Sequence, residues 1–391
     1  MDELKNEPVP FFVEVSDVQS GALYNSPFLR ACRREKADYT PIWLMRQAGR
    51  YQREYREIRE KVSFLELCKT PELAAQVTVM AVEQLNVDAA IIFADILLIV
   101  EPMGVGLAFN KGEGPSIGRP IRSAQDVDRL KEVDVNESLP FVFEAIRITR
   151  RELRSSVPLI GFCGAPFTVA SYMIEGGASR EFAQTTSLMR DDPGAWNALM
   201  ERIVRASGDY LNGQIEAGAQ AVQVFDSWVG CVDEQEYRRF VLPHTQSLIR
   251  AVSSGTPVIH FAPKNVQTKR GHSAFSEKES PLFLKAVREA GGDVIGLDWR
   301  VNLAEAWASI GYDAGVQGNL DPNVLLASPD EIRHQAKAIL DQAAGRPGHI
   351  FNLGHGVLQT TPVDHAKALV EYVHEYSTRG EGRGAGGEAE G

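Results

Sequence analysis

The chain has 391 residues, a formal net charge of −11 and 44% hydrophobic residues. This length allows one large α/β barrel or two ordinary domains. The acidic balance argues against a general nucleic-acid binder, because phosphate backbones are bound by basic surfaces. An acidic protein that binds an acidic ligand must gather its positive charge locally.

Composition divides the chain into one central domain and two simple ends. Residues 1–24 mix acidic, apolar and small side chains without a clear period, and we interpret them as a loosely attached N-terminal arm. Residues 378–391 are rich in Gly, Glu and Arg and nearly free of apolar side chains, so burial cannot offset their ordering entropy. We therefore predict a disordered tail there and a single domain over residues 25–377.

Cysteine usage and short apolar runs indicate a cytoplasmic protein with no membrane partner. The four cysteines are far apart and form no metal-like or redox pair: Cys32, Cys68, Cys163 and Cys231. This pattern suits a reducing compartment. Residues 1–5 lack the basic and apolar regions of a secretory signal. The most apolar run, Ala89 to Val100, is too short to cross a bilayer and contains Asp95.

The first apolar segment leads into two arginines four positions apart, Arg46 and Arg50, with Gly49 between them. Arginine suits carboxylate and phosphate, because its planar guanidinium donates two parallel hydrogen bonds and keeps its charge when buried. The stretch Pro41–Tyr51 therefore predicts a buried strand that ends in an anion-binding loop. The alternative is that both arginines are solvated and open a helix that begins near Glu54.

Eight short apolar segments have the length and composition of buried strands. They are residues 42–45, 90–93, 159–162, 221–225, 258–261, 294–297, 315–318 and 350–353. Helical periodicity separates most of them, over residues 71–84, 196–217, 237–252, 281–290, 329–344 and 362–376. Several of these stretches begin with Ser or Asp and a proline, as in Ser328-Pro329-Asp330, which is a helix-start signal.

The alternation of eight strands with helices is typical of a single-domain α/β fold, the (β/α)8 TIM-like barrel. An open doubly wound sheet alternates in the same way, but no Gly-rich dinucleotide turn follows the first strand. In such barrels the active site lies at the C-terminal ends of the strands. The side chains that follow these ends are Arg46, Arg50, Asp95, Tyr172, Asp226, Ser227, His260, Asp298, Asn319, Asp321 and His355.

Asp95 is the most informative of these residues, because it lies inside the most apolar run of the chain. An ionised carboxylate there is costly unless donors or cations meet it. A structural aspartate would cap the turn after the strand. We favour a chemical role over this alternative.

Four segments resemble the uroporphyrinogen decarboxylase family, and the resemblance covers nearly the whole chain. They are Pro41–Tyr51, Gly161–Gly177, Phe225–Gly230 and Asn352–Gly356. The resemblance implies a homodimeric carboxy-lyase that converts the four acetate side chains of uroporphyrinogen III to methyl groups, giving coproporphyrinogen III in haem and porphyrin biosynthesis. A protonated pyrrole ring of this tetrapyrrole substrate is itself an electron sink, so no cofactor and no metal would be needed.

The resemblance also assigns the site residues. Asp95 matches the family's central aspartate, which would accept hydrogen bonds from four pyrrole N–H groups and stabilise the cation formed when a pyrrole carbon is protonated. Arg46 is the other catalytic candidate. The loop that binds substrate carboxylates would comprise Arg46, Gln47, Ala48, Gly49 and Arg50.

Three further substrate-binding residues follow from the family motifs: Tyr172, Ser227 and His355. No Gly-x-Ser-x-Gly elbow surrounds Ser227, so we expect it to donate a hydrogen bond and not to act as a nucleophile. Tyr172 could instead be a core residue bonded to a backbone carbonyl, and His355 a packed or capped one. The glycines on both sides of His355 favour a close approach to a ligand.

Two departures from the family pattern and two rival functions stay open. Gln52-Arg53 replace the common Leu-Pro, and Pro263–Ser280 form a longer polar loop, which is either a basic flap or a solvated insertion.

A corrinoid-dependent methyltransferase of the wider superfamily would need His-x-Cys and a late cysteine, but the final third of the chain contains no cysteine. A tetrapyrrole carrier would keep the arginines and lose the acid.

Overall fold

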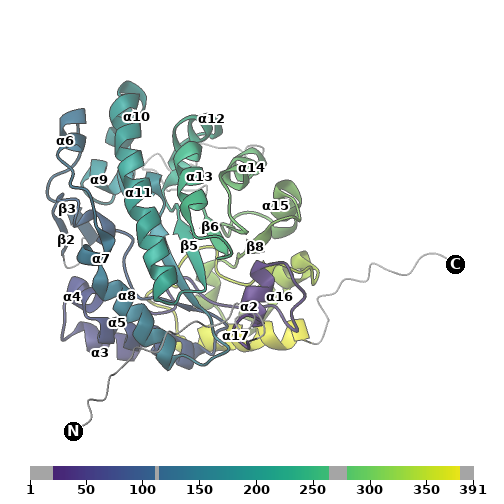
Figure 1. The fold of residues 1–391 in the computed structure, drawn as a ribbon. Helices are drawn as coiled ribbons and strands as arrows, with labels where there is room; N and C mark the ends of the chain where they lie inside the picture. Colours follow the sequence, from purple (N-terminus) through teal and green to yellow (C-terminus); the bar gives the residue numbers. More distant parts are fainter. Residues whose placement is uncertain (1–20, 111–113, 264–279, 379–391) are drawn as a thin grey trace, which may run out of the picture.

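The structure, a computed structural model, describes residues 21–110, 114–263 and 280–378 (Figure 1). Most of the predicted N-terminal arm, nearly all of the predicted tail and the interior of the polar loop from Pro263 to Ser280 lie outside the described residues.

Seven parallel strands form the main sheet, and each pairs with the next one along the chain. They are β1 (Ala90–Ile91), β4 (Leu159–Gly164), β5 (Ala221–Phe225), β6 (Val258–Phe261), β7 (Val294–Gly296), β8 (Gly315–Gln317) and β9 (His349–Ile350). These strands confirm seven of the eight predicted segments. A separate antiparallel hairpin, β2 (Leu107–Asn110) and β3 (Gly114–Ile117), was not predicted.

Helices lie outside the strands and include all six predicted stretches (Figure 1). The α-helices are α2 (Pro27–Cys32), α3 (Arg53–Arg59), α4 (Phe64–Lys69), α5 (Pro71–Leu85), α6 (Ala124–Asp128), α7 (Val135–Ser138), α8 (Pro140–Glu152), α9 (Pro166–Glu175), α10 (Ala183–Asp191), α11 (Pro193–Ala217), α12 (Glu234–Glu236), α13 (Leu242–Ala251), α14 (Ser280–Ala290), α15 (Leu303–Ile310), α16 (Pro329–Ala343) and α17 (Val363–Thr378). Shorter helical turns are η1 (Leu98–Val100), η2 (Val229–Cys231), η3 (Tyr237–Val241) and η4 (Pro322–Leu326). The predicted start signal at α16 is confirmed, because the Ser328 hydroxyl accepts a hydrogen bond from the Glu331 N–H.

The eighth predicted strand, residues 42–45, is present as an isolated bridge between Ile42 and Phe351. The Phe351 N–H donates to the Pro41 carbonyl at 2.8 Å. On the other side, the Asp88 N–H donates to the Ile42 carbonyl at 2.8 Å, and the Ile42 N–H donates to the Asp88 carboxylate at 2.7 Å. The segment therefore lies between the end of β9 and the start of β1, although its ladder is too short to count as a strand.

Asp88 also ties this segment to the last helix. Its carboxylate accepts a hydrogen bond from the Tyr39 hydroxyl at 2.8 Å and contacts His374 Nε2 of α17 at 2.7 Å. The Tyr39 and His374 rings meet edge to face with centroids 4.7 Å apart. One carboxylate thus connects β1, the 41–45 segment and α17.

Buried polar side chains on the inner face show how strongly the sheet curls. The Trp43 indole donates to Gln317 Oε1 at 2.9 Å, and Gln317 Nε2 donates to Gln223 Oε1 at 3.1 Å. Gln223 belongs to β5 and Gln317 to β8, with two strands between them in the sheet order. Side chains of a flat sheet could not meet across two intervening strands, because neighbouring strands are about 4.8 Å apart. The sheet therefore wraps around its own inner face.

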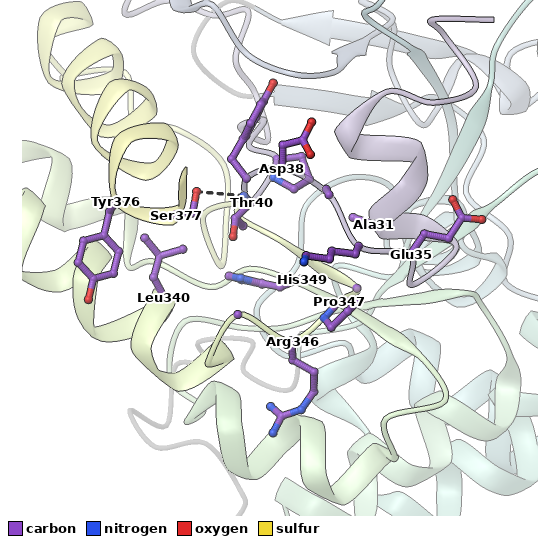
Figure 2. A pocket seen from close by; sticks show the side chains of 16 residues that line it. Ala31, Glu35, Asp38, Thr40, Leu340, Arg346, Pro347, His349, Tyr376 and Ser377 are labelled. Carbon is purple, nitrogen blue, oxygen red and sulfur yellow. Dashed lines mark hydrogen bonds between the residues drawn. The ribbon is translucent and has the colours of Figure 1, made fainter. Parts of the chain in front are cut away.

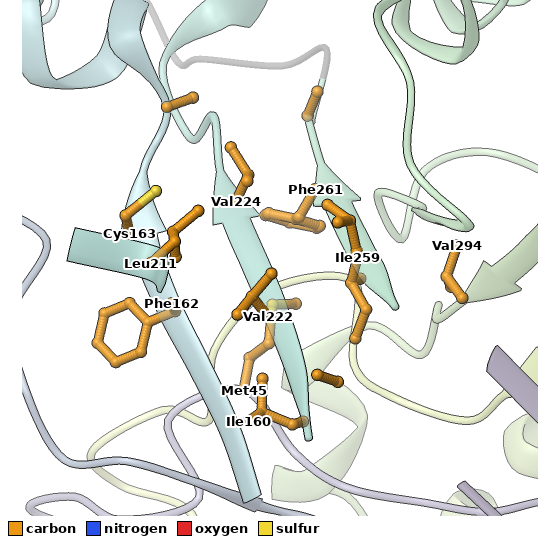
Figure 3. Packing of buried hydrophobic residues seen from close by; sticks show 14 of the residues in the cluster. Met45, Ile160, Phe162, Cys163, Leu211, Val222, Val224, Ile259, Phe261 and Val294 are labelled. Atoms are coloured by element: carbon orange, nitrogen blue, oxygen red, sulfur yellow. The ribbon is translucent and has the colours of Figure 1, made fainter. Parts of the chain in front are cut away.

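Apolar side chains pack on both faces of the sheet, inside its curl and beneath the helices (Figure 3). Phe162, Phe225 and Phe261 form a ladder across β4, β5 and β6, with neighbouring ring centroids 5.6 and 6.2 Å apart. Gly296 on β7 leaves room for the last ring, because a Cβ there would lie 2.8 Å from the Phe261 ring. The interior is thus a packed core and not a channel.

A pocket of about 280 Å³ lies at the opposite end of the sheet from the predicted site. It is bordered by the chain from Ala31 to Pro41, by the loop that enters β9, and by the end of α17 (Figure 2). Pro41 and His349 mark the amino ends of their segments, so this pocket is remote from the carboxyl ends of the strands.

Replacing Gln317 with Ala should lower the free energy of unfolding by about 2–4 kcal/mol, because it leaves the Trp43 N–H and a Gln223 oxygen buried without partners. Urea unfolding measures the change. Gln125→Ala, at an exposed position of α6, is the matched control and should change stability by less than about 0.5 kcal/mol. Equal small changes in both variants would contradict the assigned interior network.

Candidate active site

The arginine loop is held firmly by buried side chains. Gln47 is buried: its Oε1 accepts from the Leu44 N–H at 3.2 Å, and its Nε2 donates to the Ala89 carbonyl at 3.2 Å. The Tyr51 hydroxyl donates to the Gln47 carbonyl at 2.6 Å. The Gln47 side chain is therefore used to fasten the loop to β1, and a substrate contact from it stays a prediction.

Gln52, a departure from the family pattern, also supports the loop. It is fully buried, its Oε1 accepts from the Gly49 N–H at 3.0 Å, and its Nε2 donates to Gln84 of α5 at 2.9 Å. In the sequence, Gln52 is recognisable only as part of the Gln52-Arg53 pair that replaces the common Leu-Pro. The pairing with Gln84, 32 residues away, could not be inferred from local sequence.

Arg46 has an unusual backbone conformation, with φ of +62°. A left-handed conformation costs a non-glycine residue about 1–2 kcal/mol, and such strain is found mostly where function requires it. Its side chain lies against Gly356, where a Cβ would come within 2.4 Å of Arg46 Cδ. The Val357 N–H donates to the Met45 carbonyl at 2.8 Å. The loops after the first and last predicted strands therefore meet directly, and Gly356 provides the space for Arg46.

Arg46 and Arg50 are both exposed. Within the described ranges, neither guanidinium has an ion pair or a hydrogen bond to a protein acceptor. Arg53, three positions further on, pairs with Glu57 at 2.7 Å on the surface of α3. The two loop arginines are therefore exposed side chains that could meet an external anion, and their predicted role in binding one stays a prediction.

Asp95 lies at the end of β1 and is partly buried. One carboxylate oxygen accepts from the Leu97 N–H at 2.8 Å, as the capping alternative required. The other oxygen has no partner among the described residues. Desolvation raises the pKa of Asp95 to about 6, while the Leu97 N–H and the charge of Arg46 lower it. Asp95 thus caps a turn and also presents one free oxygen near a free cation.

Tyr172 joins this group from α9. Desolvation raises the pKa of its phenol, the charge of Asp95 raises it further, and the charge of Arg46 lowers it. Its ring stacks on Trp228, with centroids 3.7 Å apart and planes 28° from parallel. Ser227 precedes Trp228 in the loop after β5 and is partly buried, so its predicted contact to a ligand remains a prediction.

His355 reaches the same region from the loop after β9. Desolvation and the charges of Arg46 and Arg300 together lower the pKa of His355 to about 4. The imidazole is therefore neutral at neutral pH. Arg300, which the sequence analysis missed, pairs with Asp298 at 3.0 Å and lies over the Trp299 ring.

Several predicted strand-end residues serve the framework instead of the site surface. His260 and Asp226 are fully buried, and desolvation lowers the pKa of His260 to about 4. Asn319 donates to the carbonyls of Asp298 and Val301, at 2.9 and 2.8 Å, and Asp321 caps η4. The rule that active sites lie at the C-terminal ends of the strands selects one edge of the sheet. It does not say which side chains at that edge point toward the site.

Across residues 21–110, 114–263 and 280–378, no three His, Cys, Asp or Glu side chains are grouped as a metal site would require. The four cysteines are free, and three of them are buried. No helix in these ranges is both long and apolar enough to cross a membrane.

The fold and these residues define an α/β protein with a curled parallel sheet and, at the carboxyl ends of its strands, a candidate site in which the charge of Arg46 acts on the desolvated Asp95. A family described as "Uroporphyrinogen decarboxylase (URO-D)" matches residues 23–376. The chain therefore belongs to the uroporphyrinogen decarboxylase family, which confirms the predicted resemblance.

Individual relatives agree with this assignment. The uroporphyrinogen decarboxylase of Carboxydothermus hydrogenoformans is 54% identical over 90% of this chain and 97% of its own. That of Chloroflexus aurantiacus is 51% identical over 89% and 95%. Among solved structures, a methyltransferase from Methanosarcina mazei has the same fold, with a TM-score of 0.73 over 91% of this chain and 99% of its own at 21% identity.

Asp95→Asn should stabilise the protein at neutral pH. Because burial raises the folded-state pKa above the ordinary value near 4, the unfolded chain ionises first, and stability is lost as pH rises from about 4 to about 6. Asparagine does not ionise, so the variant does not lose stability over this pH range. We expect its free energy of unfolding to exceed that of the unmodified chain by about 2 kcal/mol at pH 7 and to equal it near pH 4, as measured by urea unfolding.

Asp134→Asn is the matched control, since Asp134 also accepts backbone N–H groups but is exposed. Because Asp134 is exposed, its replacement relieves no burial of charge and should not stabilise the protein at pH 7. An Asp95→Asn variant with equal stability changes at both pH values would contradict the desolvation of Asp95.

Proposed function

We propose that this protein catalyses the decarboxylation of uroporphyrinogen III to coproporphyrinogen III, converting four acetate side chains to methyl groups in haem and porphyrin biosynthesis. Family membership over residues 23–376 and relatives of that name at about 50% identity support the proposal. The observation that carries it is the desolvated carboxyl of Asp95, which has one oxygen without a partner among the described residues and is influenced by the charge of Arg46.

Asp95 is the acceptor for the pyrrole N–H groups and the counter-charge for the ring. A macrocycle with four inward N–H donors matches a carboxylate with one unused oxygen better than it matches a neutral side chain. Protonation of a pyrrole carbon creates a positive charge, and a carboxylate near 4 Å stabilises it by roughly 4 kcal/mol at an effective dielectric of about 20. This stabilisation acts mainly on charge that develops during the reaction.

The bond changes balance without an external electron carrier. The bond between the acetate methylene carbon and its carboxylate breaks, carbon dioxide leaves, and the electron pair enters the protonated pyrrole ring. The methylene carbon then takes up a proton to become a methyl group, and the ring loses the proton it had gained. Each decarboxylation, from acetate to methyl group, therefore consumes one proton overall. Arg46, or a water held by it, is the proposed proton donor, on its position alone.

The remaining site residues bind the carboxylates at the rim of the substrate. Arg46 and Arg50 supply the charge, and the backbone of Ala48 and Gly49 lines the loop between them. Tyr172, Ser227 and the neutral His355 supply hydrogen-bonding groups. Gln47 belongs to this set through the loop that it fastens to Ala89.

We extend the proposal to the architecture. The segment 41–45 bonds to Phe351 on one side and to Asp88 on the other, which supports closure of the sheet into a TIM-like barrel with eight positions. The barrel would occupy residues 25–377 as one domain. A homodimer in the cytoplasm, with no nucleic-acid or membrane partner, completes the proposal.

Incubation with uroporphyrinogen III under reducing conditions, followed by chromatography of the products, tests the activity. Loss of four carboxylates is the expected result. Unchanged substrate that nevertheless binds would support a carrier instead and would overturn the proposal.

Asp95→Asn should lower the single-turnover rate by about 10²–10³-fold, because it keeps the shape and removes the charge. Full activity in this variant would refute the electrostatic role of Asp95. Binding without turnover is the expected state of the variant, and equilibrium binding of the substrate checks it.

Arg46→Ala and Arg50→Ala should each raise KM at least tenfold by removing a charged hydrogen bond to a substrate carboxylate, worth about 1.5–3 kcal/mol. Arg53→Ala is the matched control, because Arg53 is exposed and paired with Glu57. Steady-state kinetics compares the three. A similar KM in all of them would contradict the role of the loop.

A further inference from the structure

Asp226 follows β5 immediately, yet it faces the interior and not the site surface. Its side chain is fully buried. One carboxyl oxygen accepts a hydrogen bond from the Thr168 hydroxyl at 2.8 Å, and the other is buried without a partner. The Asp226 N–H donates to the Phe261 carbonyl at 2.8 Å, which fixes the residue to β6. Among the described residues, Thr168 is the one side chain that bonds to the Asp226 carboxyl, so its contacts are considered next.

Thr168 lies in the first turn of α9, four residues before Tyr172. Residues four apart lie on the same face of a helix, so the position of Thr168 sets that of Tyr172. The Thr168 hydroxyl also accepts a hydrogen bond from the Trp228 N–H at 3.2 Å. The Trp228 ring in turn stacks on Tyr172. The contacts form a closed ring of four residues: Asp226, Thr168, Tyr172 and Trp228.

Ser227 lies inside this ring, between Asp226 and Trp228 in the chain. Both of its neighbours are bonded to the one hydroxyl of Thr168. The two backbone positions that flank Ser227 are therefore fixed relative to α9. The Thr168 hydroxyl therefore holds the loop that carries Ser227 against the helix that carries Tyr172.

We propose that Asp226, acting through Thr168, is a positioning residue that holds Tyr172 and Ser227 in register for the substrate. The inference rests on the proposed function for the roles of Tyr172 and Ser227. Asp226 itself touches no substrate in this arrangement. The ring joins helix α9, which follows β4, to the loop after β5, and the Thr168 hydroxyl bonds to both Asp226 and Trp228 of that loop.

The surroundings of Asp226 favour an uncharged carboxyl. Burial raises the pKa of Asp226 to about 7, and the hydrogen bond from Thr168 opposes this rise. Asparagine keeps an acceptor oxygen of the same geometry and is close to the neutral acid in shape. Leucine has a similar volume but no acceptor. The pair Asp226→Asn and Asp226→Leu therefore separates the hydrogen bond from the bulk of the side chain.

Steady-state kinetics with uroporphyrinogen III is the first test. Thr168→Val and Asp226→Leu should each lower kcat/KM by about tenfold, the upper range for the loss of one buried hydrogen bond. Asp226→Asn should stay within about threefold of the unmodified chain. Thr149→Val is the matched control, because its buried hydroxyl has no partner and lies in α8, away from the ring. Unchanged kcat/KM in Thr168→Val and Asp226→Leu would overturn the inference.

A double-mutant cycle separates positioning from general destabilisation. If Thr168 acts largely through Tyr172, Thr168→Val should cost less than about threefold in a Tyr172→Phe background, compared with about tenfold alone. Equal costs in both backgrounds would overturn the inference. Thermal unfolding of each variant shows whether the cost follows lost stability, which positioning does not require.

Near-ultraviolet circular dichroism gives a readout independent of activity. The stacked pair of Tyr172 and Trp228 should contribute a signal that is lost in Trp228→Phe and also in Thr168→Val, with the far-ultraviolet spectrum unchanged. If Tyr172→Phe retains full activity, the proposed function fails at Tyr172, while this spectrum still decides the inference. A full aromatic signal in Thr168→Val would overturn it.

Discussion

The seating of residues 41–46 between the two ends of the sheet is the constraint on which the rest of the structure depends. Its hydrogen bonds to Phe351 on one side and to Asp88 on the other connect the last strand to the first. The same segment then turns through the left-handed backbone of Arg46 and delivers a guanidinium to the site. The same short stretch of chain thus pairs with both ends of the sheet and positions Arg46. A change in its pairing would disturb the sheet and the candidate site together.

Electrostatics explains why this stretch needs so much support. Asp95 is held in surroundings that raise its pKa, and Arg46 and Arg50 have no acidic partner in the described part of the chain. Both conditions are unfavourable for the free protein, because desolvated acids and unpaired cations lose interactions that water or counter-ions would supply. The interior network of Trp43, Gln317 and Gln223 and the buried Gln47 and Gln52 hold these groups in place.

The sequence predicts the periodic features of this protein well. Seven of eight strands and all six helical stretches are where apolar period and helix-start signals placed them, because both depend on local side-chain pattern. The loop arginines and Asp95 were also identifiable, since each is a charge at the end of an apolar run. The orientation of a strand-end side chain is different. His260 and Asp226 look equivalent to Asp95 in the sequence, but both are buried on the face of the sheet that the helices cover, His260 beside Gly292 after α14 and Asp226 against Thr168 of α9. Gln52 and Thr168 act through partners 32 and 58 residues away, which no local pattern reveals.

The contact between the loops after the first and last predicted strands has a consequence for biosynthesis of the protein. The Met45 N–H bonds to the Asn352 side chain across 307 residues of sequence, and Arg46 rests against Gly356. Neither contact can form until the chain has been synthesised as far as Asn352 and Gly356. A nascent chain that has not reached these residues therefore holds Met45 and Arg46 without these two contacts. The candidate site is completed late in synthesis.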